Sequence, residues 1–312
     1  MPAAPSNRAY AAAHFALELD GEDGIGLFRS IEGGSIRADV MTYQNGANYD
    51  RWRQLGKPKF EDMKLQVGMA MSGAFINWIR DFFLGNAVRK TGAIVAADFY
   101  YNERARRHFD GAMIKELTFP KLDGSDKNAA YMTVGISVED MKFLPGTGKK
   151  LSPPEGFDSQ KLWTACNFSF ELKGLETACR RVTKIDSFTI KQNVLEYHMG
   201  GARAPVKVPS QIDFPNLTFY VPEADAAPFQ DHAEKRSVVK GQAPARLTGA
   251  LHVHDNSGKE LFAVTFAGAD IIGVTPDKSE SSSEEIKLVK VEIYTEKMAF
   301  VKYAGRDDSI QA

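Results

Sequence analysis

The sequence is poor in the features that mark most specialised classes of protein. Its 312 residues include only two cysteines, Cys166 and Cys179, which are too few for a disulfide framework and lack C-x-x-C spacing. No apolar run approaches the roughly 20 residues that span a bilayer. The opening residues also lack the charged start and apolar stretch of a signal peptide. We therefore expect synthesis and folding in the cytoplasm, two reduced cysteines and no membrane partner.

A surplus of positive charge is missing as well. The chain carries 39 basic and 40 acidic residues, which gives a net charge of −1, and the two halves are equally balanced. Proteins that bind nucleic acid specifically usually cluster Lys and Arg to neutralise phosphates. The short basic cluster at residues 104–107 has acidic residues nearby. Specific nucleic-acid binding is therefore not expected.

Catalytic motifs are scarce. The sequence contains no G-x-S-x-G, G-x-x-x-x-G-K-[ST] or H-E-x-x-H pattern. The best metal-like group is His252, His254 and Asp255, because side chains two residues apart share one face of a strand. The matching positions of the first half hold no histidine, which favours two solvent-facing imidazoles before a turn. We predict no catalytic residue, no cofactor and no metal, and hence a protein that is not an enzyme.

The sequence does contain an internal repeat, in which segments of the first half recur in the second. FALELDG from Phe15 matches FSFELKG from Phe168, and FDGAMIKELT from Phe109 matches FAGADIIGVT from Phe266. Two further segments match in the same order with nearly the same offset, and such collinear matches indicate duplication. The predicted division is a first domain at 1–146, a Pro- and Gly-rich linker at 147–159, a second domain at 160–306 and a tail at 307–312.

Short alternating segments predict a mainly β (α+β) fold, with a small β-barrel or sandwich and one flanking helix in each half. In SGAFINWIRDFFLG, Ser72 is the expected N-cap of the helix and Gly85 its stop. The second helix, within EADAAPFQDHAEKRSVVKG, is more polar, and we expect it to be shorter or less buried. The predicted strands of the first half are Phe15 to Leu19, Met63 to Val67, Ile94 to Tyr100, Phe109 to Leu117 and Met132 to Phe143.

Each half also carries a long polar insertion between its early strands. These are RADVMTYQNGANYDRWRQLGKPK in the first half and KQNVLEYHMGGARAPVKVPSQ in the second. Loops longer than about 12 to 15 residues usually have a function. Trp52, flanked by two arginines, suits a contact with a partner, although such a residue can also pack back on its own domain.

Five segments of the first half follow one another in a characteristic order: FALELDG, GLFRSIEGG, KFEDMKLQVGMAMSGAFINWIRDFF, FDGAMIKELTFPKLDG and VGISVEDMKF. This order resembles the T4-like phage tail tube family, which also supplies the inner tubes of phage-derived contractile injection systems. The likeness covers nearly all of the first domain. The second domain departs from the family, because His232 stands at the position of Trp78, and so does the duplication, since the usual member has one such domain.

The resemblance implies a small β-barrel with a flanking helix that joins its neighbours through sheet edges into a six-domain ring around a lumen. Three chains could supply the six domains, or six chains could form a two-tiered ring. We favour three, because a linker of about 15 residues lets both domains lie in one ring. The long insertions would reach the next ring. The implied oligomer and stacking contacts are Met41, Tyr43, Tyr49, Trp52, Arg53, Tyr197 and Arg203.

The implied function is a structural one: stacked rings that form the inner tail tube of a contractile phage tail or injection system. Its partners would be other copies of the chain, the sheath and baseplate proteins, and the DNA or protein cargo that passes through the lumen of the assembled particle. One alternative is a tube-initiator or baseplate ring protein of the same machine. Another is a tandem β-barrel module that binds a ligand such as a carbohydrate.

Overall fold

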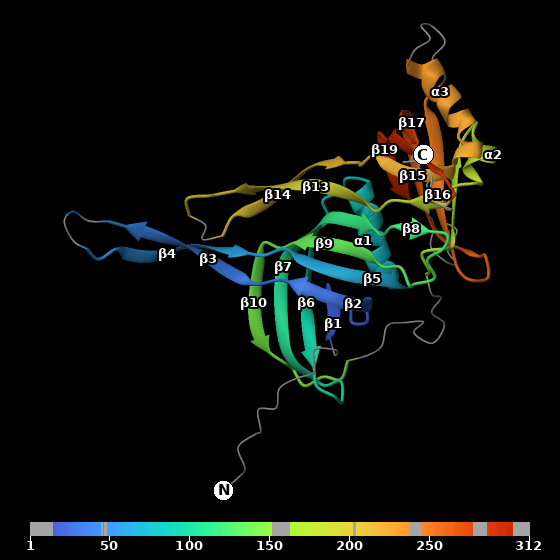
Figure 1. Ribbon diagram of the computed structural model, residues 1–312. Coiled ribbons are helices and arrows are strands. Elements are labelled where there is room, and N and C mark those ends of the chain that lie inside the picture. The colour runs from blue at the N-terminus through green and yellow to red at the C-terminus, as the bar shows by residue number, and fades with distance from the viewer. Residues whose placement is uncertain are drawn as a thin grey trace.

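The computed structural model describes residues 15–44, 46, 49–151, 163–201, 204–237, 245–276 and 286–301. The predicted mainly β fold is confirmed (Figure 1). Two long sheets and a two-stranded hairpin account for the strands of these residues. The helices are α1 (Gly73–Phe83), α2 (Glu176–Cys179) and α3 (Ala227–Ser237), with one 3₁₀ turn, η2 (Glu223–Asp225).

The first sheet follows the order β1-β6-β7-β9-β5-β2. A tight turn places β2 beside β1, so the two ends of this path meet and the sheet nearly closes into a barrel. Closure leaves few exposed strand edges. Its strands are β1 (Phe15–Leu19), β2 (Gly26–Gly33), β5 (Met63–Met71), β6 (Lys90–Ala97), β7 (Glu103–Phe119), β9 (Met132–Ser137) and β10 (Asp140–Pro145), the last paired with β7. The sheet also includes β13 (Phe188–Tyr197) and β14 (Val206–Asp213) of the second half.

The second sheet follows the order β11-β16-β17-β18-β15-β12-β8, and β19 pairs with β17. The first six strands repeat the order of the first sheet, with β11 in the place of β1 and β12 in the place of β2. Its strands are β8 (Leu122–Asp123), β11 (Phe168–Leu172), β12 (Lys184–Ile185), β15 (Leu217–Pro222), β16 (Leu247–His254), β17 (Glu260–Pro276), β18 (Leu288–Tyr294) and β19 (Lys297–Phe300).

The two long insertions form antiparallel hairpins, not loops. The first arm consists of β3 (Ile36–Tyr43) and β4 (Trp52–Phe60), and the second arm of β13 (Phe188–Tyr197) and β14 (Val206–Asp213). Figure 1 shows both arms projecting from the sheets toward the same side of the molecule. The alternating hydrophobic pattern of a half-buried strand is absent because most side chains of the first arm are exposed on both faces.

The strands predicted from Met63 and from Phe109 are longer than expected, as β5 and β7. Two other predicted strands extend past a turn or a break. The strand expected over Ile94 to Tyr100 stops at Ala97, because the Asp98 carboxylate accepts hydrogen bonds from the amides of Tyr100 (2.9 Å) and Asn102 (3.0 Å) and closes a turn. The segment expected as one strand from Met132 to Phe143 is two strands, β9 and β10, which pair with successive parts of β7.

The break between β9 and β10 lies opposite a bulge in β7. Gly111 has φ +63°, and a Cβ atom there would lie 2.5 Å from Glu139 Oε2. Glycine is therefore required, and the Glu139 carboxylate occupies the space beside it. Gly268, at the matching place in β17, has φ +66° and the same relation to Glu296.

Helix α1 begins where predicted. Ser72 Oγ accepts a hydrogen bond from the Phe75 amide (3.3 Å), and Gly85 follows the helix with φ +76°. One face of the helix is buried, including Trp78, whose Nε1 donates to Val88 O (3.1 Å). Helix α3 is also 11 residues long, so within the described chain it is not shorter than α1. It is less buried, as predicted, and Phe229 is its buried aromatic residue.

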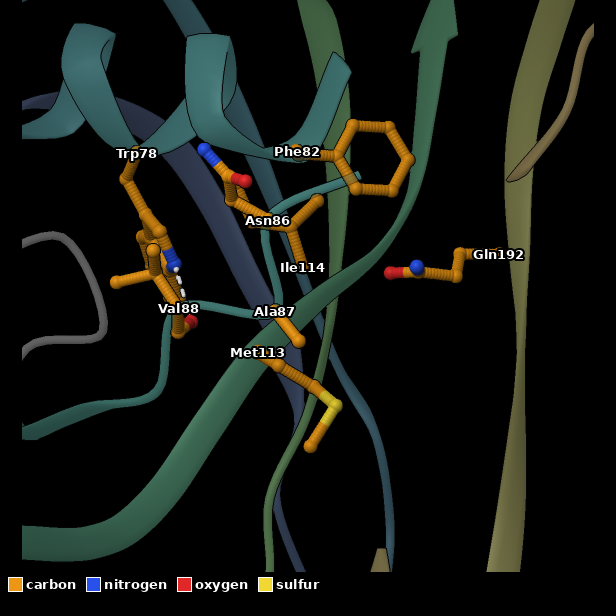
Figure 2. Close-up of a pocket in the computed structure, with 8 residues that line it drawn as sticks. All are labelled: Trp78, Phe82, Asn86, Ala87, Val88, Met113, Ile114 and Gln192. Carbon is orange, nitrogen blue, oxygen red and sulfur yellow. Dashed lines mark hydrogen bonds between the residues drawn. The ribbon is translucent and has the colours of Figure 1, made fainter. Parts of the chain in front are cut away.

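A narrow crevice lies where α1, β7 and β13 meet. Figure 2 shows Trp78 and Phe82 on the helix, Met113 and Ile114 on β7, and Gln192 on β13. The space between these residues is about 190 Å³ including open solvent, and it does not admit a water-sized sphere, so the crevice is not a small-molecule site of the usual 300 to 1,000 Å³. No described helix has the length and apolar character needed to cross a membrane.

Candidate functional site: an assembly interface

Those residues predicted to make stacking contacts that the structure describes lie on the two arms. Met41, Tyr43, Tyr49 and Trp52 are all exposed side chains of the first arm, and Arg53 is exposed beside them. Tyr197 is exposed on the second arm, and Arg203 lies outside the described residues.

Tyr43 and Trp52 are the directly opposed pair at the outer end of the first arm. Opposed residues of an antiparallel pair share one face, so the two rings form one exposed aromatic patch. Tyr43 also brings its hydroxyl to within 3.8 Å of Met41 Sδ. The arm therefore presents apolar and aromatic side chains to solvent, far from the core of the sheet that carries it.

Sequence reasoning missed a second interface, the one between the two halves of the chain. β13 of the second half pairs antiparallel with the end of β7 of the first, with Phe188 opposite Phe119 and Ile190 opposite Leu117. We call this pairing and its surroundings the internal junction. No sequence signal marks it, because edge pairing uses backbone groups that every residue carries.

Side chains also hold the internal junction together. The rings of Phe119 and Phe188 stack with their centroids 4.8 Å apart, and the hydroxyl oxygens of Thr118 and Thr189 lie 2.9 Å apart. Phe83 of α1 lies against Phe300 of β19, with centroids 6.1 Å apart. The hydrophobic core is thus continuous from one half to the other.

A buried lysine anchors the second arm on the first half. The Lys207 side chain is only 7% exposed, and its Nζ donates to Ser137 Oγ (2.9 Å) and lies 3.7 Å from Asp62 Oδ1. The Lys207 backbone is fixed as well: its amide donates to Glu139 Oε1 (3.1 Å), and its carbonyl accepts from Arg89 Nη2 (2.7 Å). Both the side chain and the backbone of Lys207 are therefore held at the internal junction.

The carboxylate that faces Lys207 is held ionised. Burial raises the pKa of Asp62, but hydrogen bonds from Lys115 (2.6 Å) and Ser137 (2.7 Å) and the charges of Lys115 and Lys207 outweigh burial. The net result is a pKa below the ordinary aspartate value. An ionised Asp62 is what a buried ammonium group needs as its partner.

The histidines of the second half are arranged for structure. His252 contacts Glu260 through Nδ1 (3.0 Å) and Glu171 through Nε2 (3.0 Å). The Asp255 carboxylate turns away and accepts from the amides of Ser257 (2.8 Å) and Lys259 (2.9 Å) within its own turn. Among the described residues, no group of three or more His, Cys, Asp or Glu side chains could hold a metal ion.

The comparison with known families bears on the first half. Residues 11–142 match the model of the T4-like virus tail tube protein gp19. This half is therefore similar to a T4-like tail tube protein, and we call it the tail tube domain. The match ends before the second half begins, and no curated protein matches the chain.

Three solved structures resemble part of this chain at low identity. A chain of the extended PVC sheath–tube complex, an extracellular contractile injection system, is 17% identical over 45% of this chain and 94% of its own, with a TM-score of 0.39. A chain of the anti-feeding prophage baseplate is 12% identical over 43% and 89%, with a TM-score of 0.35. A chain of the tube-terminating cap of that prophage is 16% identical over 46% and 95%, with a TM-score of 0.38.

Replacing Lys207 with methionine is expected to destabilise the chain by about 2 kcal/mol. The substitution keeps the length of the side chain but removes the ammonium group that faces Asp62 and Ser137 in the tail tube domain. Asp62 retains Lys115, which keeps the loss below that of a fully unpaired buried charge. Urea unfolding of the single chain measures the effect, and an unchanged midpoint would contradict it.

The same carboxylate predicts a pH dependence. Because the folded-state pKa of Asp62 is lowered, its contribution to stability is fully present above the ordinary aspartate pKa of 3.8 and is lost as the pH falls through the folded value. In Lys207→Met the pKa of Asp62 lies closer to its ordinary value. The difference in unfolding free energy between wild type and Lys207→Met should therefore shrink below about pH 4, as urea titrations at several pH values would reveal.

Proposed function

We propose that this chain is a structural ring component of the inner tube of a contractile phage tail or a related injection system, and that it has no enzymatic activity. The observation that carries the proposal is a tail tube domain whose sheet edge is already extended by a strand from the second half. A protein that builds a continuous wall needs edges that pair.

We infer that the two halves are tandem copies of one domain, at 1–146 and 160–306, joined by the linker 147–159 and followed by a short tail. The supporting observation is the register of the strands. In the first arm Tyr43 faces Trp52, and at the corresponding place in the second arm Tyr197 faces Val206. The irregularity of the first arm between Ala38 and Val40 recurs at the corresponding place between Gln192 and Val194, so the correspondence holds residue by residue.

Three chains would then supply six domains to one pseudo-sixfold ring, and the arms would reach the next ring. Stacking suits their chemistry, since exposed aromatic and apolar side chains gain most from burial against a partner. The other partners would be sheath and baseplate proteins of the same particle, and the lumen would pass DNA or protein cargo. The chain would be made in the cytoplasm and assembled into the particle.

Negative-stain electron microscopy and mass photometry of one purified sample test the proposal. Rings or tubes whose mass grows in steps of three chains are the expected result, and steps of six chains would support a two-tiered ring instead. Rings that never stack would identify a tube-initiator or baseplate ring of the same machine. A chain that stays monomeric at high concentration, even with preformed tube ends added, would contradict the proposal.

A further inference from the structure

We propose that copies of this chain join head to tail by repeating the internal junction between chains. β3 of one copy would add to the edge of β17 in the next, with Ser35 opposite Thr275 and Ile36 opposite Val274. This register rests on the proposed ring and specifies how it is held together.

The edge of β17 that would accept β3 corresponds to an edge of β7 that is already paired within the chain. In the first half, Leu117 of β7 pairs with Val134 of β9 on one side and with Ile190 of β13 on the other. In the second half, Val274 of β17 pairs with Val291 of β18, and these two residues stand at the positions of Leu117 and Val134 in the repeat. Among the described strands, none pairs with the other side of β17 over Gly273–Pro276.

The strand that would be added, β3, corresponds to β13, which is already paired with β7 within the chain. The first arm matches the second with a constant offset along both strands, so Ile36 of β3 corresponds to Ile190 of β13. Ile190 is fully buried opposite Leu117 at the internal junction, whereas Ile36 is 44% exposed. Within the described chain, β3 pairs only with β4, so its outer edge is available to a second copy.

The ion pair that holds the Lys207 backbone recurs as well. Lys207 of the second arm corresponds to Arg53 of the first, which is exposed. The pair that fixes the Lys207 backbone, Arg89 and Glu139, has as its counterpart the ion pair of Arg246 and Glu296. The Glu139 side chain is 25% exposed beneath the second arm, and that of Glu296 is 49% exposed. The backbone of an incoming Arg53 would find a carboxylate and a neighbouring arginine, as the Lys207 backbone does. The side-chain partners of Lys207 are not repeated, because Asp62 and Ser137 correspond to Asn216 and Tyr294.

Apolar surface supports the same contact. Phe300 of β19 is 2% exposed because α1 covers it, while its counterpart Phe143 in β10 is 60% exposed. Within one chain, β19 of the second half lies against α1 of the first half. In the proposed contact, the end of β10 of one copy would lie near α3 of the adjoining copy in the same way. Ile272, beside the acceptor edge, is exposed too.

The donor surface and the acceptor surface are different parts of the chain, so the contact is heterologous. Repetition of one such contact generates a ring if the rotation closes and a helical filament if it does not. Because the two halves of one chain are already related by the internal junction, each added chain would continue the same series of domains. The partner is therefore a second copy of this chain.

Disulfide trapping tests the register. Ser35→Cys combined with Thr275→Cys, and Ile36→Cys combined with Val274→Cys, should give covalent oligomers on non-reducing gels after mild oxidation, because opposed strand residues have Cα atoms within disulfide range. The largest band would count the chains in the ring. The pair Arg37→Cys and Pro276→Cys is the control: it lies three residues out of register and should stay uncross-linked, as should the wild type with Cys166 and Cys179.

The intrachain pair Thr118→Cys and Thr189→Cys is the positive control, since it traps the same geometry within one chain and should lose two free thiols by mass spectrometry. Rings that form while neither predicted pair cross-links would overturn the register and leave the proposed function standing. Cross-linked oligomers without tubes would support the register alone. Neither rings nor cross-links, with the intrachain control oxidised, would overturn both.

A charge reversal at the acceptor gives a second test. Glu296→Lys should raise the concentration needed for ring formation at least tenfold without moving the urea midpoint, because its carboxylate is exposed in the single chain and would accept the backbone amide of an incoming Arg53, as Glu139 accepts that of Lys207. Glu223→Lys is the matched control, since Glu223 is similarly exposed in an ion pair with Lys287, and it should assemble normally. Equal effects of the Glu296 and Glu223 variants would overturn the role of Glu296 in the contact.

Discussion

Replacing both Tyr43 and Trp52 with threonine should abolish tubes and leave rings intact. The two side chains form the exposed aromatic patch at the outer end of the first arm, and threonine keeps the β-propensity of both positions. Buried aromatic residues dominate the energy of protein interfaces, commonly about 2 kcal/mol or more each. Losing two of them at every contact between rings should raise the concentration for tube growth at least 100-fold, as measured by sedimentation and electron microscopy.

The matched control removes two exposed aromatic residues elsewhere. Phe99 and Tyr100 lie in the turn between β6 and β7, also exposed and also adjacent. Replacing both with serine should leave tube growth unchanged. If the Tyr43 and Trp52 variant still forms normal tubes, or if it fails already at the stage of rings, the first arm does not act in stacking.

Replacing Phe119 with alanine should destabilise the chain by about 3 to 5 kcal/mol. Phe119 is buried at the internal junction, stacked on Phe188 and within 6.1 Å of Phe262 between ring centroids. The substitution removes a large side chain from a core shared by both halves. It leaves a cavity that the paired strands β7 and β13 cannot fill by moving together, because their backbones are fixed by the pairing. Urea unfolding followed by circular dichroism measures the loss.

Phe143→Ala is the control for that experiment. This phenylalanine is exposed in the single chain, so its removal should change the unfolding free energy by less than about 0.5 kcal/mol. If Phe119→Ala lowered the unfolding free energy as little as Phe143→Ala does, packing at the internal junction would not hold the two halves together. A loss confined to one of two separate unfolding transitions would mean that the halves fold independently.

Helix α1 shows how much of the fold local chemistry fixes. Ser72 caps it, Gly85 ends it and the apolar spacing between them buries one face, each as the sequence predicts. The arms show the opposite case. Their strands are exposed on both faces, so no period of two appears in the sequence, and only the pairing of Tyr43 with Trp52 and its neighbours reveals a hairpin.

The candidate site also has one part that the sequence predicts and one part that only the structure shows. Exposed aromatic residues in a long polar insertion were recognisable from their types alone, and Met41, Tyr43, Tyr49 and Trp52 do lie exposed on the arm. The internal junction was not recognisable. Lys207 is one of many lysines in the sequence, and its burial follows from the distant Asp62, Ser137 and Glu139, which a linear reading cannot bring together.

The sequence by itself determined the mainly β fold, the capped helix, the resemblance of the first half to a tail tube protein and the internal repeat of matching segments. These depend on periodicity, capping and segment order, which are local or collinear properties. The tertiary structure decided which strand edges are filled and which are open. That distinction depends on backbone groups that meet from distant parts of the chain, as Phe119 meets Phe188, and backbone groups are the same for nearly every residue.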